Sequence, residues 1–401
     1  MTEDQKNIIT ATVPVLREHG VTLTTHFYKR MFLHHPSLKN IFNLSNQKNG
    51  KQQQALALAV LAYAEHISNP AVLLPELERI GHKHVSLDIR PEHYPIVGNH
   101  LLASIKEVLG EAATTDILDA WEAAYNQLAD LMIKVEGGMY EKARNSPGGW
   151  AGWRPFVVTK KKKESEEITS FYLKPKDGGQ VLEHIPGQFI SLRLHLPGLG
   201  LNQARQYSIS SIPDPSIYRI SVKKEKDQHL NIDGLISNHL HLNIKEGDVI
   251  ELTAPAGNFT LGKKLDSPTT FISGGVGLTP LISMLLSASQ QNPDHSLTWI
   301  HACRNEQVHA FKEPVQKIFE GHPQISSHVF YDELREGNQK EGINMGPLNL
   351  RDIAELPKDG KYYICGPAGF IKKHRNELVE LGVPAASIEF EEFGPQLLHL
   401  N

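Results

Sequence analysis

The hydrophobic pattern of this chain loses its helical period near residue 145, and that change limits the folds open to it. Before the change, apolar residues recur at helical spacing with few β-branched alternations. Five long segments follow this pattern: 14–32, 51–66, 75–87, 94–109 and 116–143. The sequence Asn145-Ser146-Pro147-Gly148-Gly149 then breaks any regular structure, and we interpret it as a linker. We therefore expect an all-α domain over residues 1–144.

Beyond the linker, short segments alternate between polar and apolar residues up to about residue 262. Residues 191–196 and 218–223 alternate with period two, and Gly and Pro separate the neighbouring segments. This pattern predicts a small antiparallel β-barrel over residues 150–262. Over residues 263–401 the order becomes strand, glycine loop, helix, strand, which predicts an α/β domain with a parallel sheet.

Composition excludes several classes of protein. The 401 residues include only two cysteines, Cys303 and Cys365, so an iron–sulfur cluster with four thiolates is excluded, as is a Cys-x-x-Cys-His haem attachment. The formal net charge of −4 indicates neither nucleic acid nor an anionic membrane as a partner. The polar N-terminus does not resemble a signal peptide, and the longest apolar run, 55–64, is shorter than the ~20 residues that span a bilayer. We expect a cytoplasmic monomer without a transmembrane segment.

One histidine lies in the centre of an apolar helical stripe. Leu77, Ile80, His84 and Leu87 follow one another at steps of three, four and three. This spacing alone favours a core histidine with a satisfied hydrogen bond. A neutral imidazole in apolar surroundings is also what an iron-ligating histidine in a haem protein requires.

Three more features of the helical third suit the surroundings of a flat apolar cofactor. Tyr28 lies on an apolar helix face, so its hydroxyl would enter an apolar pocket. Gln52 precedes Leu56 by one turn on another helix, and Phe42 lies in a segment between helices where its ring could contact a macrocycle. Each feature by itself is more typical of a core or surface residue than of a site.

Three short motifs in the remaining chain suit a flavin. Arg205-Gln206-Tyr207-Ser208 supplies a cation for a pyrophosphate, a flat ring for the isoalloxazine and a small hydroxyl for its polar edge. Gly234-Leu235-Ile236-Ser237 is either a helix start whose backbone N–H groups hold a phosphate or an ordinary turn and cap. Glu392-Phe393-Gly394-Pro395 offers an aromatic ring for the other flavin face, or a core phenylalanine before a turn.

Two further motifs suit a nicotinamide nucleotide. Ser273-Gly274-Gly275-Val276-Gly277-Leu278-Thr279-Pro280 ends a strand with glycines that let a ligand approach the backbone, although it is no G-x-G-x-x-G fingerprint. We expect Thr279 to cap the next helix and Pro280 to occupy its first position. Cys365-Gly366-Pro367 ends another strand, in register with the first if the sheet is parallel. Ligands bind at such strand ends.

Taken together, the whole chain resembles the flavohaemoglobins, a globin joined to a reductase of the ferredoxin-NADP reductase superfamily. The resemblance implies a globin haem domain over 1–144, an FAD-binding β-barrel domain over 150–262 and an NAD(P)-binding α/β domain over 263–401. It implies haem b, FAD and NADH or NADPH as cofactors. It also implies a nitric oxide dioxygenase, in which NAD(P)H reduces FAD, FAD reduces the haem, and oxygen held by the haem converts nitric oxide to nitrate.

The resemblance implies roles by position. His84, in the pair Lys83-His84, matches the proximal iron ligand, and Tyr94 and Glu136 match the pair that orients its imidazole. Without the resemblance, Glu136 would be interpreted as exposed. The distal pocket is implied at Tyr28, Gln52 and Leu56, and redox tuning at Lys83 and Glu391. The implied FAD-binding residues are Phe189, Arg205, Gln206, Tyr207, Ser208, Gly234, Ser237, Glu392, Phe393, Gly394 and Pro395. The implied nucleotide-binding residues are Ser273, Gly274, Gly275, Val276, Gly277, Leu278, Thr279, Cys365, Gly366 and Pro367.

Two other functions stay open. The same domains could form a haem-based reductase of oxygen, peroxide or nitrite. They could also form an oxygen store or sensor that the flavin domain keeps reduced. A pair such as Tyr94 and Glu136 argues against a carrier, because an electron-rich iron favours oxygen activation over reversible binding. Arg304, after the second strand of the nucleotide domain, could meet a 2′-phosphate or face solvent, so the sequence does not choose between NADH and NADPH.

Overall fold

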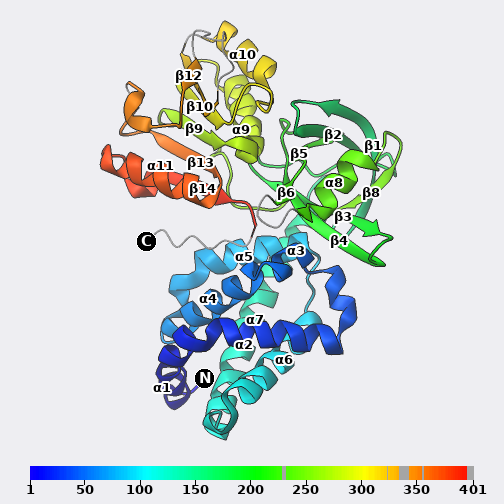
Figure 1. Cartoon of the computed structure of the whole chain (residues 1–401), viewed down its shortest axis with the longest axis vertical. Coiled ribbons are helices and arrows are strands. Elements are labelled where there is room, and N and C mark those ends of the chain that lie inside the picture. Colours follow the sequence, from blue (N-terminus) through cyan, green and yellow to red (C-terminus); the bar gives the residue numbers. More distant parts are fainter. Residues whose placement is uncertain (228–231, 323, 334–342, 355, 395–401) are drawn as a thin grey trace. The chain divides into compact units, whose positions relative to one another are not determined.

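The computed structural model of the chain (Figure 1) separates into two compact units. It describes residues 1–227, 232–322, 324–333, 343–354 and 356–394. The first unit comprises Met1–Trp153 and Ser191–Arg205, and the second comprises Arg154–Ile190 and Gln206–Asn401. The division therefore crosses two strands of the sheet, one between Ile190 and Ser191 and the other between Arg205 and Gln206.

The helical part confirms the prediction of an all-α domain. Its elements are α1 (Glu3–Ala11), α2 (Val13–His34), η1 (Pro36–Asn40), α3 (Leu44–Lys48), α4 (Lys51–Glu65), η2 (Pro70–Leu73), α5 (Leu74–Ser86), α6 (His93–Leu109), η3 (Gly110–Ala112) and α7 (Thr115–Asn145). The five predicted helices correspond to α2, α4, α5, α6 and α7, and every end lies within two residues of the predicted one. Amphipathic periodicity was a sufficient guide because each of these helices buries one face.

Helices α2 and α4 cross closely, and this crossing builds one wall of the candidate site. A Cβ on Gly20 would lie 3.4 Å from the Cβ of Ala57, so the small residues let the two backbones approach. The hydroxyl of Thr24, which is 1 % exposed, donates to the carbonyl oxygen of Gln53 at 2.9 Å. The crossing therefore fixes the face of α2 that carries Tyr28 against the first turns of α4.

The second domain is the predicted antiparallel barrel. Its elements are β1 (Arg154–Lys163), β2 (Ile168–Pro175), β3 (Phe189–Leu196), β4 (Leu201–Ser208), β5 (Tyr218–Lys223), β6 (Lys226–Asp227), β7 (Ile232–Asp233), α8 (Leu235–Leu242) and β8 (Val249–Leu252). Six strands form one sheet in the order β4-β3-β8-β1-β2-β5. Ile209, directly after β4, bridges Ile220 of β5, so the two outer strands meet and the sheet closes.

The third domain is the predicted parallel α/β domain. Its elements are β9 (Thr269–Gly274), η4 (Gly275–Gly277), α9 (Leu278–Gln291), β10 (Leu297–Cys303), α10 (Lys312–Gly321), β11 (Ile325–Tyr331), β12 (Ile343–Met345), η5 (Leu350–Asp352), β13 (Lys361–Gly366), α11 (Ala368–Glu380), η6 (Ala385–Ser387) and β14 (Ile388–Glu392). The strand order is β12-β11-β10-β9-β13-β14, and the strands run parallel.

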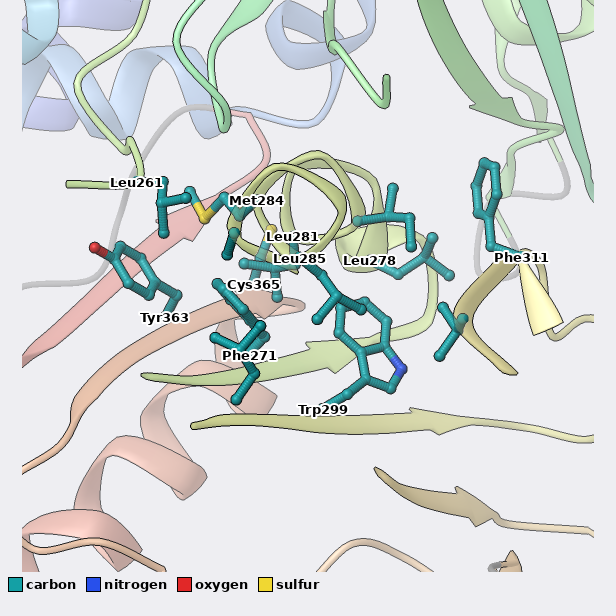
Figure 2. Close-up of a cluster of buried hydrophobic side chains, with 14 of the residues drawn as sticks. Leu261, Phe271, Leu278, Leu281, Met284, Leu285, Trp299, Phe311, Tyr363 and Cys365 are labelled. Atoms are coloured by element: carbon teal, nitrogen blue, oxygen red, sulfur yellow. The ribbon is translucent and has the colours of Figure 1, made fainter. Parts of the chain in front are cut away.

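Alternate residues of its central strands point to opposite faces of the sheet and belong to two separate hydrophobic cores. Phe271 of β9 and Trp299 of β10 pack beneath α9, together with Leu281 and Leu285 of that helix (Figure 2). Their neighbours on the other face of the sheet form a second core with α11; these are Ile272, Ile300 and Ile364. Burial on both faces agrees with β9, the strand between β10 and β13, being buried at every position. It also brings the carboxyl ends of β9 and β13 together, with Ser273 opposite Cys365.

The expected cap at Thr279 is wrong. Helix α9 begins at Leu278, because the 3₁₀ turn η4 runs directly into it, so Thr279 lies inside the first turn. Its hydroxyl donates instead to the carbonyl oxygen of Val276 at 3.1 Å. Pro280 occupies the third helical position, where its missing N–H costs no helical hydrogen bond.

Both cysteines are free thiols in the interior of the parallel α/β domain. Burial raises the pKa of Cys303 to about 12, and it raises the pKa of Cys365 well above its usual value. Among the helices that the structure describes, none combines the length and the apolar character needed to cross a lipid bilayer.

Candidate functional site

A buried carboxylate orients the imidazole of His84 through the ring nitrogen Nδ1. Its Nδ1 lies 2.7 Å from Oε1 of Glu136 and 3.2 Å from the hydroxyl oxygen of Tyr94. The Tyr94 hydroxyl donates to the same Oε1 at 2.6 Å. A carboxylate accepts only, so Nδ1 carries the proton and Nε2 keeps its lone pair. These two partners, from α6 and α7, thus leave the lone pair of Nε2 available to a metal ion.

The hydrogen-bond partners of His84, Glu136 and Tyr94, are themselves held in place by their surroundings. Glu136 is 2 % exposed and lies within the 31-residue helix α7. Burial, followed by the hydrogen bond to Glu136, raises the pKa of Tyr94 above its usual value, so its hydroxyl stays protonated and donating. The side chain of His84 is 35 % exposed, and its Nε2 makes no hydrogen bond within the described part of the chain. This donor set fits a haem iron on the Nε2 side.

The other wall of the candidate site consists of apolar side chains around the hydroxyl group of Tyr28. Tyr28 is 4 % exposed, and its ring centroid lies 5.7 Å from that of Phe42 and 5.9 Å from that of Phe32. Burial raises the pKa of Tyr28 above its usual value, while a hydrogen bond with the Gln52 side chain acts in the opposite direction. Leu56 packs against the same apolar cluster. The structure therefore brings these predicted residues together, and their distal role stays a prediction.

Glu136→Gln is expected to raise the reduction potential of the bound haem and to lower turnover about tenfold. The amide keeps the side-chain shape but removes the negative charge that makes the imidazole electron-rich. The potential is measured by spectroelectrochemical titration, and the iron–histidine stretch by resonance Raman is expected to fall in frequency. The matched control is Glu141→Gln, an exposed position on the same helix. An unchanged potential in Glu136→Gln would count against the tuning role.

The flavin motif lies at the end of β4. Arg205 and Tyr207 are both partly exposed, and Ser208 is 9 % exposed. Helix α8 begins after Gly234, and no side chain of the described residues caps its first N–H groups. Ser237, in its first turn, receives the amide hydrogen of Glu225 at 3.2 Å. A helix start without a side-chain cap fits a phosphate group such as those of FAD.

Other predicted flavin residues are accounted for in part. Phe189 lies at the start of β3, with its ring in contact range of Gly257, where a Cβ would come within 3.0 Å. Phe393 is 45 % exposed directly after β14, and such an aromatic ring can stack on a flat cofactor. Pro395 lies outside the described residues. Lys83 and Glu391 belong to different units, and their redox-tuning role stays a prediction.

The glycines of the predicted nucleotide-binding loops, at 274–277 and at 366, have different structural roles. A Cβ on Gly277 would lie 2.2 Å from the carbonyl oxygen of Cys365, so this residue lets α9 start against the end of β13. Gly275 has φ +55° and nothing within 4 Å of an added Cβ, so its surface is open to a ligand. Gly274 and Gly366 both pack against the ring of Phe370.

Two predicted nucleotide residues can offer only their backbone. Ser273 is fully buried, and its hydroxyl contacts Nδ1 of His301 at 2.7 Å inside the domain. Cys365 is also fully buried, with its thiol in the core beneath α9 (Figure 2). Sequence reasoning missed Phe370, which packs against the loop, and Gly187, whose φ of +104° and close approach to Phe259 only glycine allows. A glycine four residues before the predicted strand 191–196 was the available signal for Gly187.

Comparison with known proteins matches each part of the chain. Family models match at residues 25–132 (Globin), 155–261 (Oxidoreductase FAD-binding domain) and 271–376 (Oxidoreductase NAD-binding domain). The Flavohemoprotein of Chromobacterium violaceum is 50 % identical over 400 residues and covers 98 % of both chains. That of Bacillus subtilis is 45 % identical over 394 residues, or 97 % of this chain and 96 % of the relative.

The chain belongs to the flavohemoprotein family. A flavohemoglobin structure from Malassezia yamatoensis, with bound FAD and heme, superimposes with a TM-score of 0.86 at 25 % identity over 98 % of this chain and 99 % of that one. The FAD/NAD-binding domain of nitric oxide dioxygenase from Vibrio cholerae matches with a TM-score of 0.56 at 36 % identity, covering 60 % of this chain and 99 % of that one. As a flavohemoprotein, the chain combines a haem-binding globin with an oxidoreductase that uses FAD and a nicotinamide nucleotide.

Proposed function

We propose that this flavohemoprotein is a nitric oxide dioxygenase driven by NADH or NADPH. The observation that carries the proposal is the buried carboxylate of Glu136 on Nδ1 of His84, in a chain that also holds its own reductase. An oxygen store gains nothing from an electron-rich iron, whereas an enzyme that activates oxygen does. The similar domain from Vibrio cholerae belongs to a nitric oxide dioxygenase, which supports nitric oxide as the substrate here.

When bound, FAD would divide a hydride into single electrons, and the haem would supply the iron at which oxygen and nitric oxide react. The residues of this chain prepare that reaction. His84 offers Nε2 to the iron, while Glu136 holds the proton on Nδ1. Tyr28, buried and protonated, is available to donate a hydrogen bond to a negatively polarised ligand. The aromatic rings around it exclude water from the reacting atoms.

The test is nitric oxide consumption by purified holoprotein with NADH under air, with nitrate measured as the product. Because a hydride carries two electrons and each nitrate formed from oxygen and nitric oxide takes one, two nitrates are expected per nucleotide oxidised. Production of nitrous oxide or nitrite instead, or NADH oxidation that ignores added nitric oxide, would reject the proposal. In those cases a reductase of oxygen or nitrite would be the better assignment.

Tyr28→Phe is expected to speed loss of oxygen from the ferrous protein by about 10- to 100-fold and to slow nitric oxide turnover. The substitution keeps the ring packing and removes only the donor. The rate is measured by stopped-flow replacement of oxygen with carbon monoxide. The matched control is Tyr63→Phe on α4, whose hydroxyl donates to the carbonyl oxygen of Ala124 at 3.2 Å and should matter for stability only. Equal rates for Tyr28→Phe and the unaltered protein would remove the distal role.

The structure gives Arg304 a partner that bears on nucleotide choice. Arg304 follows β10 at the carboxyl edge of the sheet, and its guanidinium pairs with the carboxylate of Glu167. Glu167→Gln is expected to free the guanidinium for a 2′-phosphate and to lower the KM for NADPH about two- to fivefold, with NADH unaffected. Steady-state flavin reduction with each nucleotide measures the effect. An equal change for both nucleotides would show that Arg304 does not meet the 2′ position.

We also propose that the protein works as a monomer in the cytoplasm. The proposal of a reducing compartment rests on the two cysteines, both unpaired.

A further inference from the structure

A glutamine that no motif singles out is fully buried on β4. Gln203 is 0 % exposed. Its Nε2 donates to the carbonyl oxygens of Lys39 at 2.8 Å and Phe42 at 3.4 Å, and also to that of its neighbour Asn202 at 3.0 Å. Its Oε1 accepts the amide hydrogen of Leu44 at 3.3 Å. One side chain therefore satisfies three backbone groups of the short stretch from the end of η1 to the start of α3.

Two more bonds join the same strand to the same segment. The amide of Asn202 donates to Oδ1 of Asn40 at 2.7 Å, and Arg205 reaches the hydroxyl of Ser45 at 3.5 Å. All of these residues belong to the first compact unit. Residues 39–45 are thus held by contacts spaced along β4.

Residues 39–45 include Phe42, whose ring forms part of the apolar wall of the candidate haem site. The ring centroid of Phe42 lies 5.7 Å from that of Tyr28 and 5.4 Å from that of Phe32. Gln203 bonds the carbonyl of Phe42 itself and the amide two residues later. Buried polar groups that lose their partner destabilise the local structure, so the position of Phe42 depends on Gln203.

The same strand carries the candidate flavin motif. Arg205 lies two residues beyond Gln203 on the same side of β4, and Tyr207 and Ser208 follow. We propose that Gln203 is a positioning residue that fixes the flavin-binding end of β4 to the Phe42 segment and thereby sets the rate of electron transfer from flavin to haem. The inference deepens the proposed function and rests on its flavin-to-haem relay. The rate of transfer between two groups depends on how accurately both are held in place, so the loss of these hydrogen bonds is expected to slow it.

The experiment uses full-length holoprotein with Gln203→Leu, which introduces an apolar side chain of similar volume and removes every side-chain hydrogen bond of Gln203. Hydrogen exchange of the Leu44 amide is expected to speed up about tenfold or more, because its acceptor is gone. In anaerobic stopped flow with NADH, flavin reduction should stay within about twofold, while haem reduction should slow about tenfold or more. FAD and haem contents should match those of the unaltered protein.

Controls separate positioning from general damage. Asn202→Ala keeps the backbone N–H that bonds Asn40, and it should leave both reduction rates unchanged. Gln203→Glu keeps an acceptor for the Leu44 amide but places a buried carboxylate against the three carbonyl oxygens, so haem reduction at least as slow as in Gln203→Leu is expected. It also replaces Gln203→Leu if that variant loses FAD. Haem reduction at the unaltered rate in both Gln203 variants, or flavin and haem reduction slowed equally, would overturn the inference.

The two proposals fail in different ways. If the unaltered protein makes no nitrate, yet Gln203→Leu still slows haem reduction selectively, only the assignment of nitric oxide as the substrate is rejected. If nitrate forms as expected and Gln203→Leu reduces its haem at the normal rate, only the positioning role of Gln203 is rejected.

Discussion

His84→Ala is expected to remove the haem Soret band from the purified protein while leaving the flavin absorbance in place. Nε2 of His84 is prepared as a lone-pair donor by the Glu136 carboxylate on Nδ1, and alanine offers no ligand to the iron. The hydrogen-bonded carboxylate would remain without its imidazole partner. Haem content is measured by the pyridine haemochrome assay, and flavin content by release of FAD on heating.

His82→Ala is the matched control, since His82 lies on the same helix but off the stripe that carries His84. It should bind haem normally. Adding imidazole to His84→Gly should restore a Soret band, because the free base can occupy the emptied position. Full haem retention in His84→Ala without added imidazole would reject the ligand assignment.

Arg205→Ala is expected to produce the opposite loss, with haem retained and FAD bound about 10- to 100-fold more weakly. A charge-assisted hydrogen bond to a phosphate contributes about 1.5–3 kcal/mol, and alanine removes it together with the cation. The dissociation constant is measured by flavin fluorescence titration of the deflavinated protein. NADH-driven reduction of ferricyanide should fall with FAD occupancy and recover when excess FAD is added.

Arg193→Ala serves as the control for this variant, because Arg193 lies on the neighbouring strand β3 and stacks over Trp153 at 4.4 Å. It removes an arginine that lies outside the motif in sequence. Unchanged FAD affinity in Arg205→Ala would refute the assignment. Together, His84→Ala and Arg205→Ala should show that each cofactor can be lost without the other.

The helices and the order of the domains could be predicted because each depends on local pattern. The stripe through His84 and the glycine loop at 274–277 are visible in consecutive residues. Glu136 was different, since its residue pattern alone suggested an exposed position. Its burial comes with a contact to His84, 52 residues away in sequence, and no local period encodes such a pairing.

The same limit explains Gln203. Its partners on the helical side lie 159 to 164 residues earlier in the chain, and a glutamine in a half-polar strand has no pattern that distinguishes a clamp from a surface residue. The wrong cap at Thr279 has another cause. The 3₁₀ turn η4 runs directly into α9, so the helix begins one residue before Thr279. Helix boundaries are the least certain part of any prediction from propensity.

The buried thiols of the parallel α/β domain have a chemical consequence for a protein proposed to work among nitrogen oxides. Nitrosation and sulfenic acid formation proceed through thiolates that reagents can reach. Cys303 and Cys365 are the whole sulfhydryl complement of the chain, and their raised pKa values keep both protonated at neutral pH. If the protein consumes nitric oxide as proposed, its buried, protonated thiols are expected to resist S-nitrosation.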